Sequence, residues 1–164
     1  MRQRTGYPWQ WAIAGVVALT LACGGWAWGS ALAAERFVQK LSLAPGLVAV
    51  VAEGDLEARS IGSYSVRIYF DPASGPENEI TFYTAGLVRG RDGVLLSIAP
   101  LVLGEGQPTL LMVVMQSAGS GGYLSADAFA VTPRDIELKA SVRELPATEN
   151  PATSLRRQLA GARP

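Results

Sequence analysis

After residue 34 the sequence predicts an all-β fold, because strand-like runs recur and no helical pattern separates them. Runs rich in Val, Ile, Tyr, Phe and Thr alternate with short breaks of Gly, Pro, Asp and Asn. The alternation is clearest in residues 64–70, where Tyr64, Val66, Ile68 and Phe70 would share one face of a strand. Many short strands at this spacing are typical of an antiparallel sandwich or barrel.

We expect about eight strands, separated by residues that favour turns. Two prolines in residues 71–76 predict a loop, because proline fixes φ and donates no ladder hydrogen bond. Asp92-Gly93 suits positive φ and predicts a hairpin turn over residues 90–93, while residues 104–108 predict another turn. The expected strands are 36–41, 46–53, 62–70, 79–89, 93–102, 109–116, 123–131 and 135–142.

The C-terminal tail has a different pattern. Residues 146–151 are typical of a linker, and Thr153 or Ser154 could cap a short helix that runs through Leu159. Leu155 and Leu159 are spaced i, i+4, so one face of this helix could pack on the body. We therefore expect a β-domain at 34–145, followed by a linker and short C-terminal helix at 146–164.

Residues 1–33 have the pattern of a targeting segment. Arg2 and Arg4 precede an uncharged run, residues 9–34, which as a helix at ~1.5 Å per residue would cover about 39 Å. Three interpretations stay open: a signal peptide cut after Ala33, an uncleaved membrane anchor, or a lipoprotein acylated at Cys23. The small-x-small pattern at residues 31–33 favours cleavage. All three place the rest of the chain outside the cytoplasmic membrane, with membrane attachment if the segment is retained or lipidated.

Composition excludes several classes of function. The sequence has no histidine, which excludes Ser-His-Asp and Cys-His catalysis and removes the commonest zinc ligand. Cys23 is the only cysteine, so neither an intrachain disulfide nor a thiolate cluster can form. Without residues 1–33, which hold two arginines and no acid, 12 basic residues face 14 acidic ones, a net charge of −2. That balance provides no basic surface for binding nucleic acid. We also expect no metal and no cofactor.

The carboxylates do not predict a catalytic pair. A glycosidase needs an acid and a base, one of them in a setting that raises its pKa. None lies in an apolar context of that kind, and Glu53, Asp55 and Glu57 are interpreted as a solvated strand end. Glu105 offers one carboxylate where calcium prefers several oxygens, so its segment is interpreted as a plain turn. We therefore expect that this protein is not an enzyme.

A glycine-rich stretch between two predicted strands is the strongest candidate site. An apolar run at 109–115 precedes Gln116-Ser117-Ala118-Gly119-Ser120-Gly121-Gly122-Tyr123, and a further strand follows. Gly119, Gly121 and Gly122 would permit a tight projecting turn, because glycine reaches positive φ without a Cβ clash. Such a turn would present Ser120 and Tyr123. Read from the residues alone, an ordinary hairpin with a half-buried tyrosine explains the pattern as well.

This stretch, Ser120-Gly121-Gly122-Tyr123, resembles the Ser-Gly-x-Tyr loop of the periplasmic inhibitors of invertebrate-type (I-type) lysozymes. A second patch, residues 60–69, is also similar to that family, and the resemblance covers roughly residues 59–159. It implies an antiparallel β-sandwich, found as a homodimer, that acts in the periplasm or at the cell surface. Ser63 and Tyr64, in the second patch, are interpreted as structural.

The resemblance implies that the protein inhibits I-type lysozyme. Ser120 would enter the lysozyme cleft and hydrogen-bond the catalytic carboxylates, and Tyr123 would support the loop or contact the cleft wall. Gly119, Gly121 and Gly122 would shape the backbone of this partner-binding loop. The alternative is an envelope β-sandwich that binds a cell-wall component or an assembly partner and has no inhibitory activity. An exposed Ser120 loop would favour the inhibitor, and a buried Tyr123 with a packed-down loop would favour the alternative.

Overall fold

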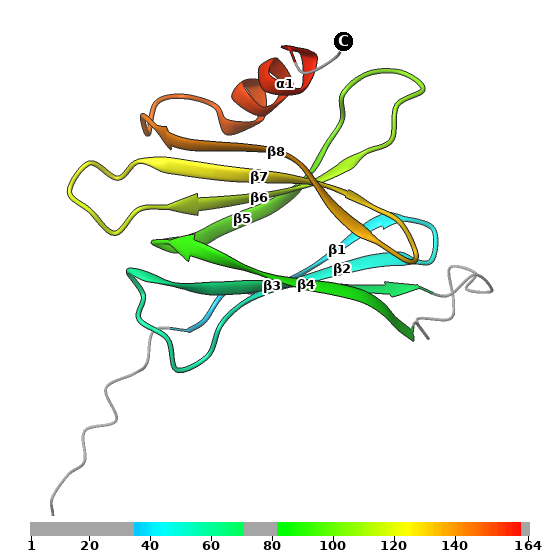
Figure 1. Cartoon of the computed structure of the whole chain (residues 1–164), viewed down its shortest axis with the longest axis horizontal. Helices are drawn as coiled ribbons and strands as arrows, with labels where there is room; N and C mark the ends of the chain where they lie inside the picture. Colours follow the sequence, from blue (N-terminus) through cyan, green and yellow to red (C-terminus); the bar gives the residue numbers. More distant parts are fainter. Residues whose placement is uncertain (1–34, 71–81, 162–164) are drawn as a thin grey trace, which may run out of the picture. The chain divides into compact units, whose positions relative to one another are not determined.

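The computed structural model describes residues 35–70 and 82–161, which belong to one compact unit, Ala34–Pro164. The predictions for residues 1–33 and for the loop at 71–76 lie outside the described residues. The described chain forms two four-stranded antiparallel sheets and one helix (Figure 1). The strands are β1 (Val38–Ala44), β2 (Leu47–Glu53), β3 (Ile61–Phe70), β4 (Phe82–Asp92), β5 (Val94–Leu101), β6 (Leu110–Gln116), β7 (Leu124–Val131) and β8 (Ile136–Leu145).

Each sheet contains four consecutive strands in sequence order. Sheet A has the order β1-β2-β3-β4, and sheet B has the order β5-β6-β7-β8. In sheet A, Val51 pairs with Val66 and Val66 pairs with Leu87, so apolar residues of neighbouring strands line up on one face. The predicted eight-stranded sandwich is confirmed, and its strand ends differ from the expected ones by up to three residues.

The expected hairpin turn at 90–93 is wrong. β4 continues to Asp92, and Gly93 alone separates it from β5, which belongs to the other sheet. Gly93 has a φ of +86°, and a Cβ there would lie 1.8 Å from the carbonyl oxygen of Gln116. The position requires glycine, as the sequence suggested, but the chain uses it to pass from one sheet to the other.

The two faces of sheet B pack against different partners. One face meets sheet A in a core cluster that includes Val66, Ile68, Val113 and Phe129. The other face is covered by α1 (Pro151–Gly161), whose Leu155 joins a second cluster. Figure 1 shows these layers, with α1 beside β7 and β8 and sheet A on the other side of sheet B. β6 is therefore buried on both faces, which explains its continuous apolar sequence.

The C-terminal helix is confirmed, but its cap is not the expected one. Asn150 caps α1, because its Oδ1 accepts hydrogen bonds from the backbone N–H of Ala152 (2.9 Å) and Thr153 (3.3 Å). Thr153 and Ser154 lie inside the first turn, and the buried Ser154 hydroxyl donates to Glu149 Oε1 at 2.6 Å. No helix in the described part of the chain has the length and hydropathy needed to cross a bilayer.

Candidate functional site

Two loops lie at the same end of the sandwich, which we call the loop end. They are the β2–β3 loop (residues 54–60) and the β6–β7 loop (residues 117–123). Strand register brings them together, since Ile61 pairs with Asp92 at the end of β4, and Val94 pairs with Gln116 at the end of β6. Gly93 joins the two loops: its N–H donates to Ser60 O at 2.7 Å, and its α-carbon lies against the backbone at Gln116. In Figure 1 both loops lie on the left.

The β6–β7 loop is closed by its own hydrogen bonds. The Ser117 N–H donates to Tyr123 O at 2.8 Å, and the Gly122 N–H donates to Gly119 O at 3.1 Å, which makes a tight turn. Gln116 Nε2 donates to Gly122 O at 3.4 Å. Residues 118–121 are exposed. The loop thus projects from two strands whose core residues are buried.

Ser120 and Tyr123 lie where the sequence placed them, on the projecting loop. Ser120 is exposed, and its hydroxyl has no hydrogen-bond partner among the residues that the structure describes. Tyr123 is 49% exposed, and its ring lies across Gly121, so close that a Cβ on that glycine would be 2.3 Å from the ring. The loop is not packed down, and Tyr123 braces it from one side.

The three loop glycines have different roles. Of the three, Gly122 alone has positive φ, +54°. Gly121 is needed for space beneath the Tyr123 ring, whereas a Cβ on Gly119 would make an ordinary 3.5 Å contact with Ser117 Oγ. The turn therefore uses the positive φ of glycine at Gly122 alone, and the absence of a side chain at Gly121.

A pocket of about 370 Å³ opens beside the loop. Tyr123 and Ser117 form its loop side, and Glu144 in β8 adopts a φ of +55°, a conformation uncommon for a residue with a Cβ. Asp92 and Ser125 complete the lining. The surface beside the β6–β7 loop is therefore polar and concave.

Behind this pocket along β7 lies Asp127, a fully buried carboxylate that sequence reasoning missed. Tyr64 Oη donates to Asp127 Oδ2 at 2.5 Å, and Ser141 Oγ donates to Oδ1 at 2.6 Å. Two arginines pair with it, Arg143 at 2.7 Å and Arg89 at 3.3 Å. Burial alone would raise the pKa of Asp127, but the hydrogen bonds from Ser141 and Tyr64 and the charge of Arg143 outweigh it and lower the pKa.

Asp127 is also the hydrogen-bond partner of Tyr64. From the sequence, Tyr64 is interpreted as a structural residue, and its complete burial agrees with that interpretation. Burial and the adjacent Asp127 carboxylate raise the pKa of Tyr64, so the phenol stays protonated and donates its hydrogen bond. Tyr64 belongs to sheet A and Asp127 to sheet B. The pair therefore links the two sheets directly behind the loop end. A lone Asp in the otherwise apolar run Ala126–Phe129 was the available sequence signal.

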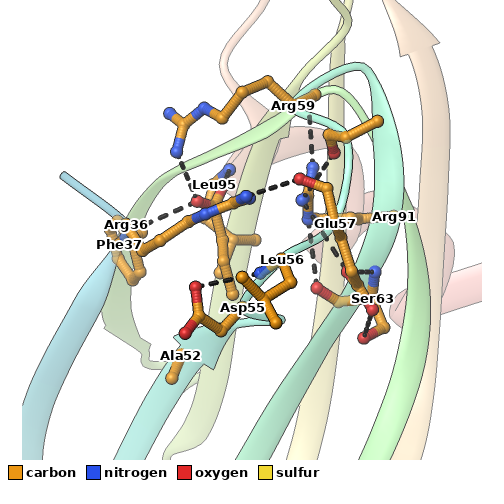
Figure 2. A network of polar contacts seen from close by, with 12 residues as sticks. Arg36, Phe37, Ala52, Asp55, Leu56, Glu57, Arg59, Ser63, Arg91 and Leu95 are labelled. Atoms are coloured by element: carbon orange, nitrogen blue, oxygen red, sulfur yellow. Dashed lines mark hydrogen bonds and ion pairs between the residues drawn. The ribbon is translucent and has the colours of Figure 1, made fainter. Parts of the chain in front are cut away.

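The β2–β3 loop is held by a second polar network, shown in Figure 2. The Arg91 side chain is fully buried, and it donates to the carbonyl oxygens of Ser63, Arg59 and Ala58, each at 3.0 Å, and to that of Gly93. Glu57 accepts hydrogen bonds from the backbone N–H of Ser63 at 2.5 Å and from its hydroxyl at 2.6 Å. The hydroxyl and backbone of Ser63, followed by the charge of Arg91, lower the pKa of Glu57.

Glu53 corrects the expectation of a solvated strand end. Its side chain is buried, and its carboxylate accepts hydrogen bonds from the backbone N–H of Leu95 at 2.8 Å and from Arg59 at 2.8 Å. Because Leu95 belongs to sheet B, Glu53 joins the two sheets as Asp127 does. Asp55 is exposed as expected. No group of three or more His, Cys, Asp or Glu side chains in the described ranges could hold a metal ion.

Comparison with known proteins decides which family this arrangement represents. A model of the periplasmic lysozyme inhibitor of I-type lysozyme (PliI) matches residues 35–159. The chain belongs to the PliI family. The match begins at residue 35, so the family relationship reaches further toward the N-terminus than the resemblance at 59–159 suggested. No curated protein matches the chain.

Two solved PliI structures are similar to the described fold. The crystal structure of PliI-Ah from Aeromonas hydrophila is 37% identical, with a TM-score of 0.65, and the match covers 73% of this chain and 98% of that one. The structure of Aeromonas hydrophila PliI in complex with Meretrix lusoria lysozyme is 36% identical, with a TM-score of 0.64, and covers 73% and 95%. PliI proteins are periplasmic by description, which agrees with the export expected from residues 1–33. The homodimer implied by the resemblance stays a prediction.

Proposed function

We propose that this protein inhibits I-type lysozyme by inserting the β6–β7 loop into the lysozyme active-site cleft. The observation that carries the proposal is Ser120, which is exposed on a projecting loop and whose hydroxyl has no internal partner in the described part of the chain. A relative that is 36% identical has been crystallised with a lysozyme, which supports a lysozyme as the partner.

The chemistry of the loop suits a cleft that contains carboxylates. A hydroxyl that donates to a carboxylate makes a stronger hydrogen bond than one between neutral groups. Ser120 supplies that donor, and Gly121 and Gly122 keep the loop narrow beside it. The bonds within the loop fix its turn before docking, so binding costs little conformational entropy. Tyr123 braces the loop and offers its exposed edge to the wall of the cleft.

The buried carboxylates support an inhibitor rather than an enzyme. A glycosidase needs a carboxylic acid whose pKa is raised, facing a second carboxylate across a cleft. Asp127 has a lowered pKa, and both Asp127 and Glu53 are buried and paired with arginine. These groups hold the two sheets together and do not face a cleft.

The alternative, an envelope sandwich that binds a cell-wall component or assembly partner without inhibiting, predicted a packed-down loop and a buried Tyr123. The exposed Ser120 and the half-exposed Tyr123 favour the inhibitor.

The test is lysozyme activity in the presence of the 34–164 portion, which contains both core clusters. I-type, C-type and G-type enzymes are assayed side by side. We expect dose-dependent loss of activity for the I-type enzyme. Full activity of the I-type enzyme at micromolar protein would refute the proposal and favour the alternative.

A further inference from the structure

The outer face of sheet A, which points away from sheet B, is uncovered in the described part of the chain. Sheet B has α1 on its outer face, whereas no helix or strand of the described ranges packs on that of sheet A (Figure 1). Val66 and Ile68 point into the core, so Arg67 between them points outward. Two large side chains of β4 are exposed there, Val88 at 70% and Tyr83 at 61%. This face, which we call the sheet A face, is therefore open to a partner.

Strand register arranges the outward residues of the sheet A face in three rows that cross its strands. One row carries the positive charge and another carries the aromatic rings. The members are Lys40, Val50, Arg67 and Gly86 in the cationic row, Ser42, Val48, Tyr69 and Tyr83 in the aromatic row, and Val38, Ala52, Ser65 and Val88 in the third row. None of these residues is Asp or Glu, so the face combines positive charge with apolar surface.

Arg67, in the middle of the cationic row, has no acidic partner. Its Nε is buried without a hydrogen bond, and its guanidinium forms no ion pair with a residue that the structure describes. The exposed Lys40 lies two strands away, at roughly 10 Å across the sheet. A buried donor without an acceptor costs free energy, and a carboxylate bound on this face would supply the acceptor. Charge complementarity therefore indicates an anionic ligand.

The aromatic row offers this ligand a flat surface. Tyr69 and Tyr83 pack edge to face, with their ring centroids 6.0 Å apart. Tyr83 lies along β4, since a Cβ on Gly86 would be 2.8 Å from the Tyr83 hydroxyl. Because Gly86 pairs with Arg67, this exposed ring lies next to Arg67 on the sheet. Aromatic rings beside a cation suit a chain of sugar rings that carries carboxylates, because the apolar face of a sugar stacks on an aromatic ring.

We propose that the sheet A face binds peptidoglycan through its carboxylate-bearing glycan chains. PliI proteins are periplasmic by description, and peptidoglycan is the periplasmic polymer with this chemistry. Arg67 pairs with a carboxylate, and Tyr83 stacks on a sugar ring. Hydroxyls in both flanking rows, at Ser42 and Ser65, suit a glycan better than a lipid surface. The aromatic row lies toward the opposite end of β3 from the loop end, so this contact is separate from the β6–β7 loop.

Co-sedimentation of the 34–164 portion with purified peptidoglycan tests the proposal. We expect the wild type to sediment, and its dissociation constant to rise about tenfold in Arg67→Met and in Tyr83→Ala. Met keeps an apolar side chain and removes a guanidinium that pairs with no described residue, so Arg67→Met should unfold at the wild-type urea concentration. Added salt should weaken the wild type more than Arg67→Met, because the lost contact is ionic.

Arg134→Met is the matched control. It removes the same charge from an exposed position in the β7–β8 loop, which belongs to sheet B, and it should bind peptidoglycan as the wild type does. Equal losses in Arg67→Met and Arg134→Met would show that net charge alone causes binding, and the proposed site would be wrong.

The outcomes also separate this proposal from the proposed function. A wild type that inhibits I-type lysozyme on a soluble oligosaccharide but does not sediment refutes the peptidoglycan contact alone. A wild type that sediments but does not inhibit supports the contact and refutes the proposed function. Ser120→Ala should sediment as the wild type does, and Arg67→Met should inhibit as the wild type does.

Three results would assign the sheet A face to another partner and overturn the proposal. Equal binding to chitin, a glycan without carboxylates, would show that the cationic row does not recognise the ligand. Binding to phosphatidylglycerol vesicles in place of peptidoglycan would identify a membrane surface as the partner. A lower mass of free Tyr83→Ala in light scattering, with no loss of sedimentation, would show that the face joins two copies of this chain.

Discussion

The two loops at the loop end are held in opposite ways. The β6–β7 loop closes on itself through the pairs Ser117–Tyr123 and Gly122–Gly119, without a charged group in its turn. The β2–β3 loop is tied to the sandwich by the buried side chain of Arg91 and by two carboxylates, Glu53 and Glu57. The β6–β7 loop is narrow and exposed, and the β2–β3 loop is anchored by these side-chain contacts.

Under the proposed function, this difference separates two tasks that the loop end would combine. A loop that enters a cleft must be thin, so bulky anchoring side chains cannot lie inside it. Its position must then be fixed from outside, by the strands and by the neighbouring loop. Gly93 connects the β2–β3 loop to the base of the β6–β7 loop, because its N–H donates a hydrogen bond to Ser60 O and its α-carbon lies against the backbone at Gln116. Damage to the β2–β3 network should therefore reduce stability, and damage to the β6–β7 turn should reduce binding.

Arg91→Met should produce the largest loss of stability. Met fills similar apolar volume, but the carbonyls of Ser63, Arg59, Ala58 and Gly93 lose their donor. We expect the free energy of unfolding to fall by about 3–5 kcal/mol, measured by urea denaturation. Arg134→Met, at an exposed loop position, is the control and should change it by less than about 0.5 kcal/mol. Equal small effects from both variants would show that the network does not anchor the loop.

Asp127→Asn should lower the free energy of unfolding by about 2–4 kcal/mol, because the amide cannot accept all the hydrogen bonds that the carboxylate receives. The effect depends on pH. The folded pKa of Asp127 is lowered, so its contribution is complete above the unfolded pKa of ~3.9 and is lost as pH falls through the folded value. The stability difference between wild type and variant should shrink below about pH 4.

Urea denaturation of both proteins between pH 7 and pH 2.5 measures this difference. Asp135→Asn, at an exposed aspartate whose Oδ1 bonds the next backbone N–H, is the surface control at pH 7 and should change the free energy of unfolding by less than about 0.5 kcal/mol. A difference that grows as the solution is acidified would contradict the lowered pKa.

Gly122→Ala should have a smaller effect on stability, about 1 kcal/mol, because alanine is strained at a φ of +54°. Inhibition should weaken more than stability suggests, since the turn that carries Ser120 would be reshaped. Gly119→Ala is matched to it, because a Cβ at Gly119 has room and no positive φ is required. If the two variants weaken inhibition equally, the conformation of the turn at Gly122 is not what presents Ser120.

Local patterns in the sequence predicted most of the fold. Alternating residues such as Val66 and Ile68 mark strands because each strand buries one face, and the turn at 104–108 follows from its glycines. The route from β4 to β5 could not be predicted in this way. Asp92-Gly93 is compatible with a hairpin, and the crossing between sheets depends on contacts with Gln116, which lies far away in sequence.

The candidate site was predicted only in part, because sequence patterns report local structure and not contacts between distant strands. Ser120 and Tyr123 form a local motif, so their position on one projecting loop could be expected from the sequence. The burial of Glu53, Arg91 and Asp127 depends on partners in other strands, and no local pattern shows that a charged residue will be paired.

The most direct test of the central claim is the affinity of Ser120→Ala for I-type lysozyme, measured by calorimetry beside the wild-type 34–164 portion. Ser120 has no internal hydrogen bond in the described residues, so the variant should unfold at the same urea concentration as the wild type. We predict a loss of binding free energy of about 1–3 kcal/mol, with a parallel loss of inhibition. An unchanged affinity in a fully folded variant would contradict the account, because the loop would then not enter the cleft through Ser120.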